Sequence, residues 1–238
     1  MTRLSVNINK YALVRNSRGG NSPDVLQIAR DCEKFGAQGI TVHPRQDERH
    51  IRYADVAPLK EIVTTEFNIE GFPDERFMKM ALEVCPDQCT LVPDASNQLT
   101  SDHGWDTIRE KEFLTETVGK LQEKGIRVSL FLNPEEKMVE GAKQTGANRI
   151  ELYTGAYAEE FSTNCDAAIK PHINASKLAD ELNLGINAGH DLNLDNLKFY
   201  KNAVENLAEV SIGHAIICDA IYYGLENTIH KYLDELKD

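Results

Sequence analysis

Several short apolar runs of this chain stop at a residue that can move a proton or bind an anion, and this pattern constrains the fold most. The run 39–42 stops at His43, and the run 66–69 stops at Glu70. Runs of the same kind lead into Glu151, His190 and His214. A (β/α)8 barrel gathers the carboxyl ends of its strands at one face and builds its active site there. The pattern therefore predicts an α/β fold of this type, a TIM barrel, with its chemistry at that face.

Eight strand candidates alternate with helical segments, at intervals that leave room for a crossover helix in each unit. They end near Asn9, His43, Glu70, Val92, Leu132, Leu152, Asn187 and Ile212. The length of 238 residues is close to the roughly 250 of one barrel, and no Pro- or Ser-rich linker divides the chain. We therefore expect a single catalytic barrel domain over residues 1–238, with additional loops or helices at 94–106 and 153–173 and a last helix at 216–236.

The charge balance limits the partners of the protein. Lys and Arg number 26 against 38 Asp and Glu, which gives a net charge of −12 without any basic block. This balance disfavours nucleic acid and anionic membranes, although a few local arginines can still bind the phosphate of a small substrate. No apolar stretch approaches the roughly 18 residues of a membrane span. Residues 1–7 look like a strand rather than a signal peptide, so we expect a cytoplasmic protein.

The cysteines and several other residues carry no expected chemistry. The five cysteines are odd in number and scattered, which indicates reduced thiols. Cys85 and Cys89 have a C-x3-C spacing without a second Cys/His pair nearby, so we expect core packing and no metal site. His103, His172 and His230 are expected to be solvated. The pair Tyr222–Tyr223 is expected to pack in the core or at a subunit contact.

Histidines and carboxylates at the predicted face suit proton transfer. Histidine titrates near neutral pH, so His43, His190 and His214 around one pocket could move several protons in turn. Burial at the end of an apolar strand would raise the pKa of Glu70 toward that of a working base. The structural alternatives are a hydrogen bond within the fold for a single histidine and a salt bridge inside the barrel for Glu70. The gathering of several candidates at one face favours catalysis.

Two glycine–histidine pairs indicate where an anion binds. Gly189–His190 and Gly213–His214 follow the seventh and eighth strand candidates, where barrels commonly hold a phosphate. Small residues at these positions leave backbone N–H groups exposed to the anion, although a glycine after a strand can also simply form a turn. Arg18 lies in a Gly-rich segment and could close over a second anionic group; the alternative is an ordinary surface arginine.

Ten short strings occur in register from about Ser5 to the final helix. They are VNIN at 6–9, RNSRG at 15–19, GITVHPR at 39–45, RHI at 49–51, NIE at 68–70, LVP at 91–93, VSLF at 128–131, IELYTG at 150–155, NAGH at 187–190 and IGHAII at 212–217. Each string is short, but together they closely resemble the pyridoxine 5′-phosphate synthase family, which closes the ring in vitamin B6 biosynthesis. The resemblance covers effectively the whole chain.

The resemblance implies a TIM barrel with additional helices, assembled as a homo-octamer (a tetramer of dimers). It implies that 1-deoxy-D-xylulose 5-phosphate condenses with 3-amino-2-oxopropyl phosphate to give pyridoxine 5′-phosphate, phosphate and water. No step of this reaction demands a redox cofactor or a metal, so we expect neither. Each step moves a proton, which explains why several acid–base groups would surround one bound molecule.

The resemblance also implies a role for each matched residue. His43 and Glu70 would be proton acceptors, and His190 would be the proton donor. The aminoketone phosphate would be held by Asn7, Arg18, Gly213 and His214. The deoxyxylulose phosphate would be contacted by Arg45, His50 and Thr100, with Glu151 also in the pocket.

Three expected substrate-binding positions depart from the family pattern. Asn9 and Lys10 stand where the family commonly has Asp-His, which leaves Lys10 able to neutralise a phosphate but puts the usual contacts in question. Asp191 replaces the glycine that commonly follows the proton-donor histidine. Its backbone N–H could still bind phosphate, whereas its carboxylate would oppose an anion. We expect retained activity with altered affinity.

Two other functions fit parts of the same pattern. A sugar-phosphate isomerase or aldolase would use the same barrel, but a Schiff-base aldolase needs a strand-end lysine, and Lys10 is the nearest candidate. A non-catalytic phosphate-metabolite sensor would bind without turnover. The set of separate acid–base candidates favours an enzyme over a sensor, because binding alone needs no such set.

Overall fold

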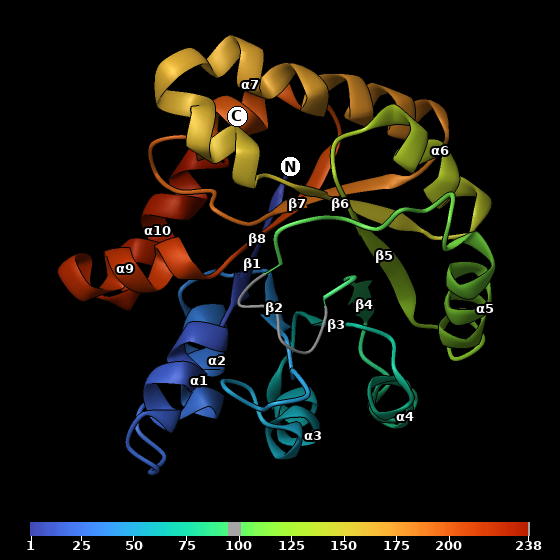
Figure 1. Ribbon diagram of the computed structural model, residues 1–238. Helices are drawn as coiled ribbons and strands as arrows, with labels where there is room; N and C mark the ends of the chain where they lie inside the picture. The colour runs from blue at the N-terminus through green and yellow to red at the C-terminus, as the bar shows by residue number, and fades with distance from the viewer. Residues whose placement is uncertain (95–100, 238) are drawn as a thin grey trace.

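The computed structural model describes residues 1–94 and 101–237, and its strands form a closed parallel barrel (Figure 1). Neighbouring strands pair in chain order, and β1 also pairs with β8 to close the ring. The strands are β1 Arg3–Asn7, β2 Gly39–Val42, β3 Glu66–Gly71, β4 Gln88–Leu91, β5 Arg127–Leu132, β6 Arg149–Tyr153, β7 Gly185–Gly189 and β8 Leu207–Ile212. The structure therefore confirms the TIM barrel that the strand pattern predicts.

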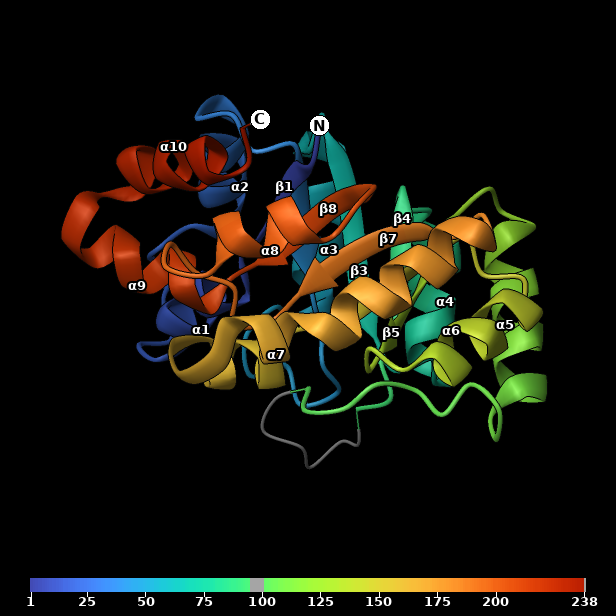
Figure 2. The same cartoon turned by 90° about the horizontal axis from the view of Figure 1, so that it is seen from above.

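Helices surround the barrel and connect successive strands (Figure 2). They are α1 Asn9–Asn16, α2 Val25–Lys34, α3 Tyr53–Ile62, α4 Glu75–Val84, α5 Lys111–Gln122, α6 Glu136–Gln144, α7 Gly155–Glu181, α8 Leu197–Ala203, α9 His214–Tyr223 and α10 Leu225–Glu235. Side-chain caps begin two of them: the Asp24 carboxylate accepts from the N–H of Leu26 at 2.9 Å, and that of Asp74 accepts from the N–H of Phe77 at 2.7 Å. Within the described residues, no helix is long and apolar enough to cross a membrane.

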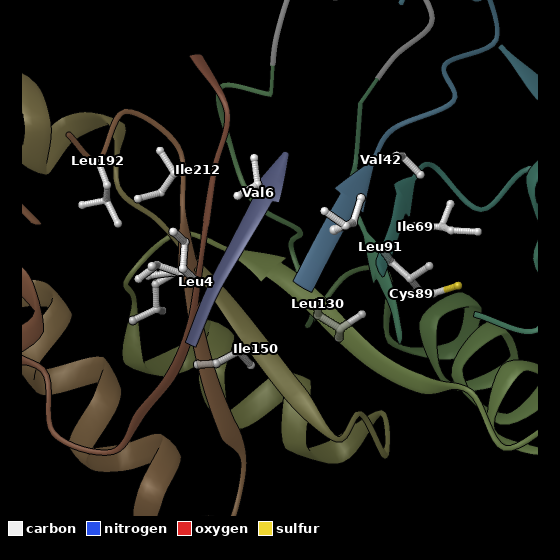
Figure 3. Close-up of a cluster of buried hydrophobic side chains, with 14 of the residues drawn as sticks. Leu4, Val6, Val42, Ile69, Cys89, Leu91, Leu130, Ile150, Leu192 and Ile212 are labelled. Atoms are coloured by element: carbon white, nitrogen blue, oxygen red, sulfur yellow. The ribbon is translucent and has the colours of Figure 1, made fainter. Parts of the chain in front are cut away.

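The apolar core lies between the strands and the surrounding helices. Strand side chains alternate between the two faces of a sheet, and the alternate residues Leu4 and Val6 are fully buried in this layer with Val42, Ile69 and others (Figure 3). The residues between them carry polar side chains that face the barrel interior. Ser5 and Thr41 illustrate this, since their hydroxyl oxygens lie 2.7 Å apart across β1 and β2.

The barrel interior is polar in successive layers. At the end where the strands begin, Arg3 forms ion pairs with Glu66 at 2.7 Å and with Glu209 at 3.3 Å, and Arg127 also pairs with Glu66. Next, the Asn68 amide donates to the Thr41 hydroxyl at 3.2 Å. The carboxylates nearest the strand ends therefore rest on a hydrogen-bonded polar layer rather than on the branched apolar side chains that usually fill such barrels.

The largest differences from the expected strand ends occur at β1 and β7. The first strand ends at Asn7 rather than Asn9, because Ile8 leaves the extended conformation (ψ 9°) and Asn9 begins α1. Strand β7 continues to Gly189 rather than ending at Asn187. The expected last helix, 216–236, is two helices separated by Gly224, whose φ of +75° ends α9. The additional helix expected within 153–173 is present as part of α7.

The structure contradicts one expected side-chain environment and excludes one of two alternatives for another. His172 is buried rather than solvated, because the turn of α7 places its Nδ1 2.9 Å from the Tyr200 hydroxyl of α8. Burial lowers the pKa of His172 to about 4, so the ring is neutral at pH 7. Tyr222 and Tyr223 do not pack in the core of the chain, since Tyr222 is 84% exposed on α9. Their other expected place, a subunit contact, remains a prediction.

Candidate active site

The sequence-predicted site residues come from the carboxyl ends of the strands or from the loops and helices that follow them. Glu70 lies near the end of β3, Glu151 within β6, and His43 directly after β2. His190 and Asp191 follow β7, and Gly213 and His214 follow β8. Because all strands of the barrel are parallel, these positions share one face.

Glu70 is a partly buried carboxyl group of this face with two neutral hydrogen-bond partners. The Asn7 amide donates to its Oε2 at 3.2 Å, and the Ser211 hydroxyl donates to its Oε1 at 3.5 Å. Burial raises the pKa of Glu70 well above its ordinary value, and the nearby charges of Glu151 and Asp94 raise it further. A carboxyl group in this setting takes up a proton far more readily than an exposed one, as a general base must. Its partners are neutral, so the expected alternative of a salt bridge is not found among the described residues.

Glu151 is a buried carboxyl group beside the partly buried Glu70. It is 3% exposed, and the Thr90 hydroxyl lies 3.4 Å from its Oε2 and 3.2 Å from the Asn68 amide oxygen. Burial raises the pKa of Glu151 to about 7, against the opposing influence of the His190 charge and the Thr90 hydrogen bond. Two carboxyl groups that interact in a buried site cannot both ionise easily, so one of them retains a proton near neutral pH.

His43 and His50 form a buried pair at the same face. Their ring centroids lie 6.0 Å apart, and each residue is 8% exposed. The Asn9 side-chain oxygen accepts from the His43 backbone N–H at 2.8 Å, and the His50 Nδ1 accepts from the Ile51 N–H at 3.0 Å. Burial lowers the pKa of both rings, that of His50 to about 4. Both rings are therefore neutral at pH 7 and able to accept a proton.

Arg45 is held beside this pair by a buried carboxylate. Its Nη1 lies 3.0 Å from the Asp94 Oδ2, and the Ser101 hydroxyl donates to the same oxygen at 2.8 Å. Both members of the ion pair are less than a tenth exposed. A small cavity between His43, Arg45 and Asp94 adjoins the β2–α3 loop. The expected substrate contact Thr100 lies outside the described residues.

The loop after β7 carries His190 and Asp191 side by side. The His190 Nδ1 lies 3.2 Å from the Asp191 Oδ2, and the His190 ring meets that of Tyr153 edge to face at 5.5 Å. The hydrogen bond from His190 lowers the pKa of Asp191, and the charges of His190, His214 and Lys10 lower it further. Asp191 therefore interacts with charged groups at the ends of β7 and β8 and at the start of α1.

The end of β8 offers backbone N–H groups to an anion. Gly213 precedes α9, and His214 is the first residue of that helix. A side chain at position 213 would place its Cβ 2.8 Å from the Asn7 backbone oxygen, so only glycine fits against β1 here. A helix N-terminus with unpaired N–H groups and a positive dipole end binds phosphate well. His214 is exposed and lies 3.7 Å from the Cys218 sulfur.

Two predicted substrate-binding cations lie at the start of the chain. Lys10 is half-buried in α1, and its charge contributes to lowering the pKa values of both His50 and Asp191. Arg18 follows α1 and is exposed. Across residues 1–94 and 101–237, no hydrogen bond or ion pair joins the Arg18 side chain to the other site residues. The structure thus brings together the predicted set except for Arg18 and the undescribed Thr100.

Sequence reasoning missed the neutral residues that hold the acid–base groups. Thr90 bonds to Glu151, Ser211 bonds to Glu70, and Thr154 bonds to the carbonyl oxygen of Gly189 at 2.8 Å. The signal that could have found Thr90 and Ser211 is the two-residue alternation of the strands, since a polar residue between two apolar ones faces the barrel interior. In the described part of the chain, no group of three or more His, Cys, Asp or Glu side chains could hold a metal ion.

Replacing Glu151 with Gln should make the protein more stable at alkaline pH. A carboxyl group whose pKa rises to about 7 on folding contributes stability below its ordinary value near 4.5, and loses that contribution as the pH rises from there through 7. Gln does not titrate in this range. The melting temperature of Glu151→Gln should match that of the unsubstituted protein near pH 4.5 and exceed it by several degrees at pH 8. Equal differences at both pH values would contradict the raised pKa.

Several known proteins are similar to this chain in sequence or in fold. A family model described as "Pyridoxal phosphate biosynthesis protein PdxJ" matches residues 4–238. The pyridoxine 5′-phosphate synthases of Cytophaga hutchinsonii and Porphyromonas gingivalis are 61% and 56% identical to the chain, over 100% and 99% of both sequences. Among solved structures, a phosphoribosylanthranilate isomerase of Thermotoga maritima has a TM-score of 0.63 at 14% identity, covering 99% of this chain and 98% of that one. A putative fructose-1,6-bisphosphate aldolase of Coccidioides immitis has a TM-score of 0.65 at 13% identity, covering 99% and 91%. The two structures show the fold alone.

Proposed function

Because the chain belongs to the PdxJ family, we propose that it condenses 1-deoxy-D-xylulose 5-phosphate with 3-amino-2-oxopropyl phosphate to give pyridoxine 5′-phosphate, phosphate and water. The observation that carries the proposal is the partly buried Glu70 beside the buried Glu151, flanked by His43 and His190, at the end of the barrel where such enzymes work. The site belongs to one catalytic barrel over residues 1–238.

The geometry supports a separate role for each acid–base group. Glu70 accepts a proton, since desolvation raises the pKa of its carboxyl group and its hydrogen-bond partners are neutral. His43 also accepts a proton, because burial keeps its ring neutral at pH 7. His190 donates a proton from the loop after β7, and Glu151 lies beside Glu70 as the second carboxyl group of a pair that shares one proton near neutral pH. Groups with different proton affinities around one bound molecule suit a reaction in which every step moves a proton.

Two phosphate-binding regions lie on either side of these groups. One is formed at the end of β8 and in the loop after β7, where the N–H groups near Gly213 and Asp191 and the side chains of Asn7 and His214 would hold the aminoketone phosphate, with Arg18 closing over it. The other would hold the deoxyxylulose phosphate and consists of Asn9, Lys10, Arg45 and His50; the resemblance adds Thr100, which lies outside the described residues. Arg45 is already oriented there by Asp94. The reaction changes no oxidation state overall, so the proposal includes no cofactor and no metal.

An apolar patch on α1 and α9 supports assembly of the protein into a homo-octamer (a tetramer of dimers), which we propose to reside in the cytoplasm. Leu13 and Val14 of α1 are 41% and 49% exposed, and Ile221 and Tyr222 of α9 are 75% and 84% exposed. The two helices contact each other (Figure 1), and each carries exposed apolar side chains. Exposed apolar side chains that gather on neighbouring elements are typical of protein contacts.

The assembly can be tested by changing this patch. Ile221→Lys should place an unpaired charge in the proposed contact and shift the particle mass toward smaller species, without altering the melting of the dissociated chain. Mass photometry of both proteins measures the change, with the exposed Lys79→Ala on α4 as a control away from this patch. A protein that is monomeric before any substitution would contradict the proposal.

A two-substrate assay tests the proposed reaction. Purified protein is mixed with both phosphorylated substrates, and pyridoxine 5′-phosphate and free phosphate are followed together. Equal amounts of the two products, and none when either substrate is left out, are expected. Saturable binding of a substrate without any turnover would contradict the proposal and favour a sensor. Borohydride trapping of a substrate on Lys10 would favour an aldolase instead.

A further inference from the structure

The loop after β7 holds two consecutive non-glycine residues in a rarely used backbone conformation. His190 has a φ of +82°, and Asp191 has a φ of +50°. Only a few per cent of non-glycine residues adopt positive φ values, and Asp does so more readily than most. Thr154, between β6 and α7, secures this conformation. Its hydroxyl donates to the Gly189 oxygen at 2.8 Å and also contacts the His190 oxygen, and its N–H donates to the Gly189 oxygen at 3.1 Å. Backbone strain that neighbouring hydrogen bonds hold in place is typical of loops at functional sites.

The consequence of this backbone is that the two side chains meet. The His190 Nδ1 lies 3.2 Å from the Asp191 Oδ2. An ionised carboxylate only accepts hydrogen bonds, so the proton in this contact belongs to Nδ1 of the ring. Nε2 is then the nitrogen that exchanges a proton with another group. The Tyr153 ring, at 5.5 Å and 70° to the imidazole, limits its rotation from the other side.

The surroundings of the pair keep the Asp191 carboxylate ionised. Besides His190, the charges that act on it are those of His214 from α9 and Lys10 from α1. From β6, the Glu151 carboxyl group and the Tyr153 hydroxyl also face this region, and the charge of His190 acts on Glu151. Asp191 thus lies between the proposed proton donor and the proposed phosphate site. A carboxylate in this place repels the substrate phosphate, so we expect it to have another role.

We propose that Asp191 is a positioning residue, which orients the His190 ring and holds one proton on Nδ1, so that the doubly protonated ring donates its other proton from Nε2 to the substrate and returns to the neutral Nδ1–H form. The inference rests on the proposed function, in which His190 is the proton donor. It assigns to the Asp191 carboxylate a use distinct from the backbone N–H that would contact phosphate. Carboxylate partners act in the same way on histidines in many active sites, by selecting the tautomer and the ring orientation.

Asp191→Asn tests the proposal without changing the size of the side chain. Asn also tolerates a positive φ, so the loop should keep its conformation. Its amide can offer an N–H to Nδ1 and so favour the wrong tautomer. We expect kcat to fall roughly 10- to 100-fold, with the KM for 3-amino-2-oxopropyl phosphate unchanged or lower. Asp195→Asn removes one charge from the same loop, where the Asp195 carboxylate makes no hydrogen bond or ion pair within the described residues, and should leave kcat unchanged.

A measurement on the protein without substrate separates this proposal from the proposed function. In magic-angle-spinning NMR of protein labelled with ¹⁵N-histidine, the His190 signals are identified by their loss in His190→Gln. We expect a protonated, hydrogen-bonded Nδ1 in the unsubstituted protein and a change of that signal in Asp191→Asn. A ring protonated only on Nε2 would overturn the proposal even if the protein turned over neither substrate. So would an Asp191→Asn variant with full kcat and a lower KM, because the carboxylate would then only repel phosphate.

Discussion

Glu70→Gln should lose most of the turnover while the protein keeps its fold. General acid–base groups contribute about 10²- to 10⁴-fold to a rate, so we expect kcat to fall within that range. Gln has the same shape, and its side-chain oxygen can still accept from the Asn7 amide at the position of the present 3.2 Å bond. It cannot accept a proton from the substrate. Joint release of pyridoxine 5′-phosphate and phosphate under saturating substrates measures the change.

The melting temperature and the substrate affinity of Glu70→Gln distinguish the loss of a general base from damage to the structure of the site. Burial raises the pKa of Glu70, so its ionised form is costly in the folded protein and the neutral amide should not lower the melting temperature at pH 8. Either substrate should still bind to the variant. Glu75→Gln, on the exposed surface of α4, is the matched control and should retain full activity. A Glu70→Gln variant within about threefold of the original kcat, far less than the loss expected of a general base, would remove Glu70 from the proposed mechanism.

The barrel could be predicted because its determinants are local in the sequence. Each strand is a short apolar run between helical segments, and the run ends differ from the observed strand ends by at most two residues, as at Asn7 and Gly189. The break at Gly224 was missed because the apolar spacing continues across it, although a glycine inside a helical pattern is itself a warning. The environment of His172 depends on a contact with Tyr200, which lies 28 residues further along the chain, and no local pattern encodes that contact.

The site was predictable in its residue types but not in its pairings. The strand ends identified Glu70, Glu151 and both histidines flanking them, because the parallel topology brings such ends to one face. That Arg45 binds Asp94 and that Asp191 meets His190 depends on loop conformations, above all on positive φ values that no residue type guarantees. From the sequence, Asp191 was expected to oppose phosphate binding, since only the sign of its charge near a phosphate could be judged. The structure shows that the same carboxylate contacts the His190 imidazole, which it can orient.

A buried arginine outside the catalytic set should have the largest effect on stability. Arg15 is 2% exposed, and its Nη1 and Nη2 each lie 2.8 Å from a carboxylate oxygen of Asp55, which joins α1 to α3. Its Nη2 also donates to the His50 carbonyl oxygen at 3.1 Å. Removing one partner of a buried ion pair costs about 3–5 kcal/mol, because the other charge stays buried without compensation. In a chain of this size, Arg15→Met should lower the melting temperature by roughly 6–20 °C.

The same ion pair connects stability to the site, since α1 carries Asn9 and the His50 carbonyl belongs to the β2–α3 loop. Asp55→Asn alone should also destabilise, because this side chain accepts from the Arg52 N–H at 2.8 Å at the start of α3. The double variant Arg15→Met/Asp55→Asn should lose clearly less than the sum of the two, as expected for groups in direct contact. Arg30→Met, on the exposed face of α2, should change the melting temperature by little. Additive losses from Arg15 and Asp55 would show that their contact contributes nothing, and that the fixed position of His50 has another cause.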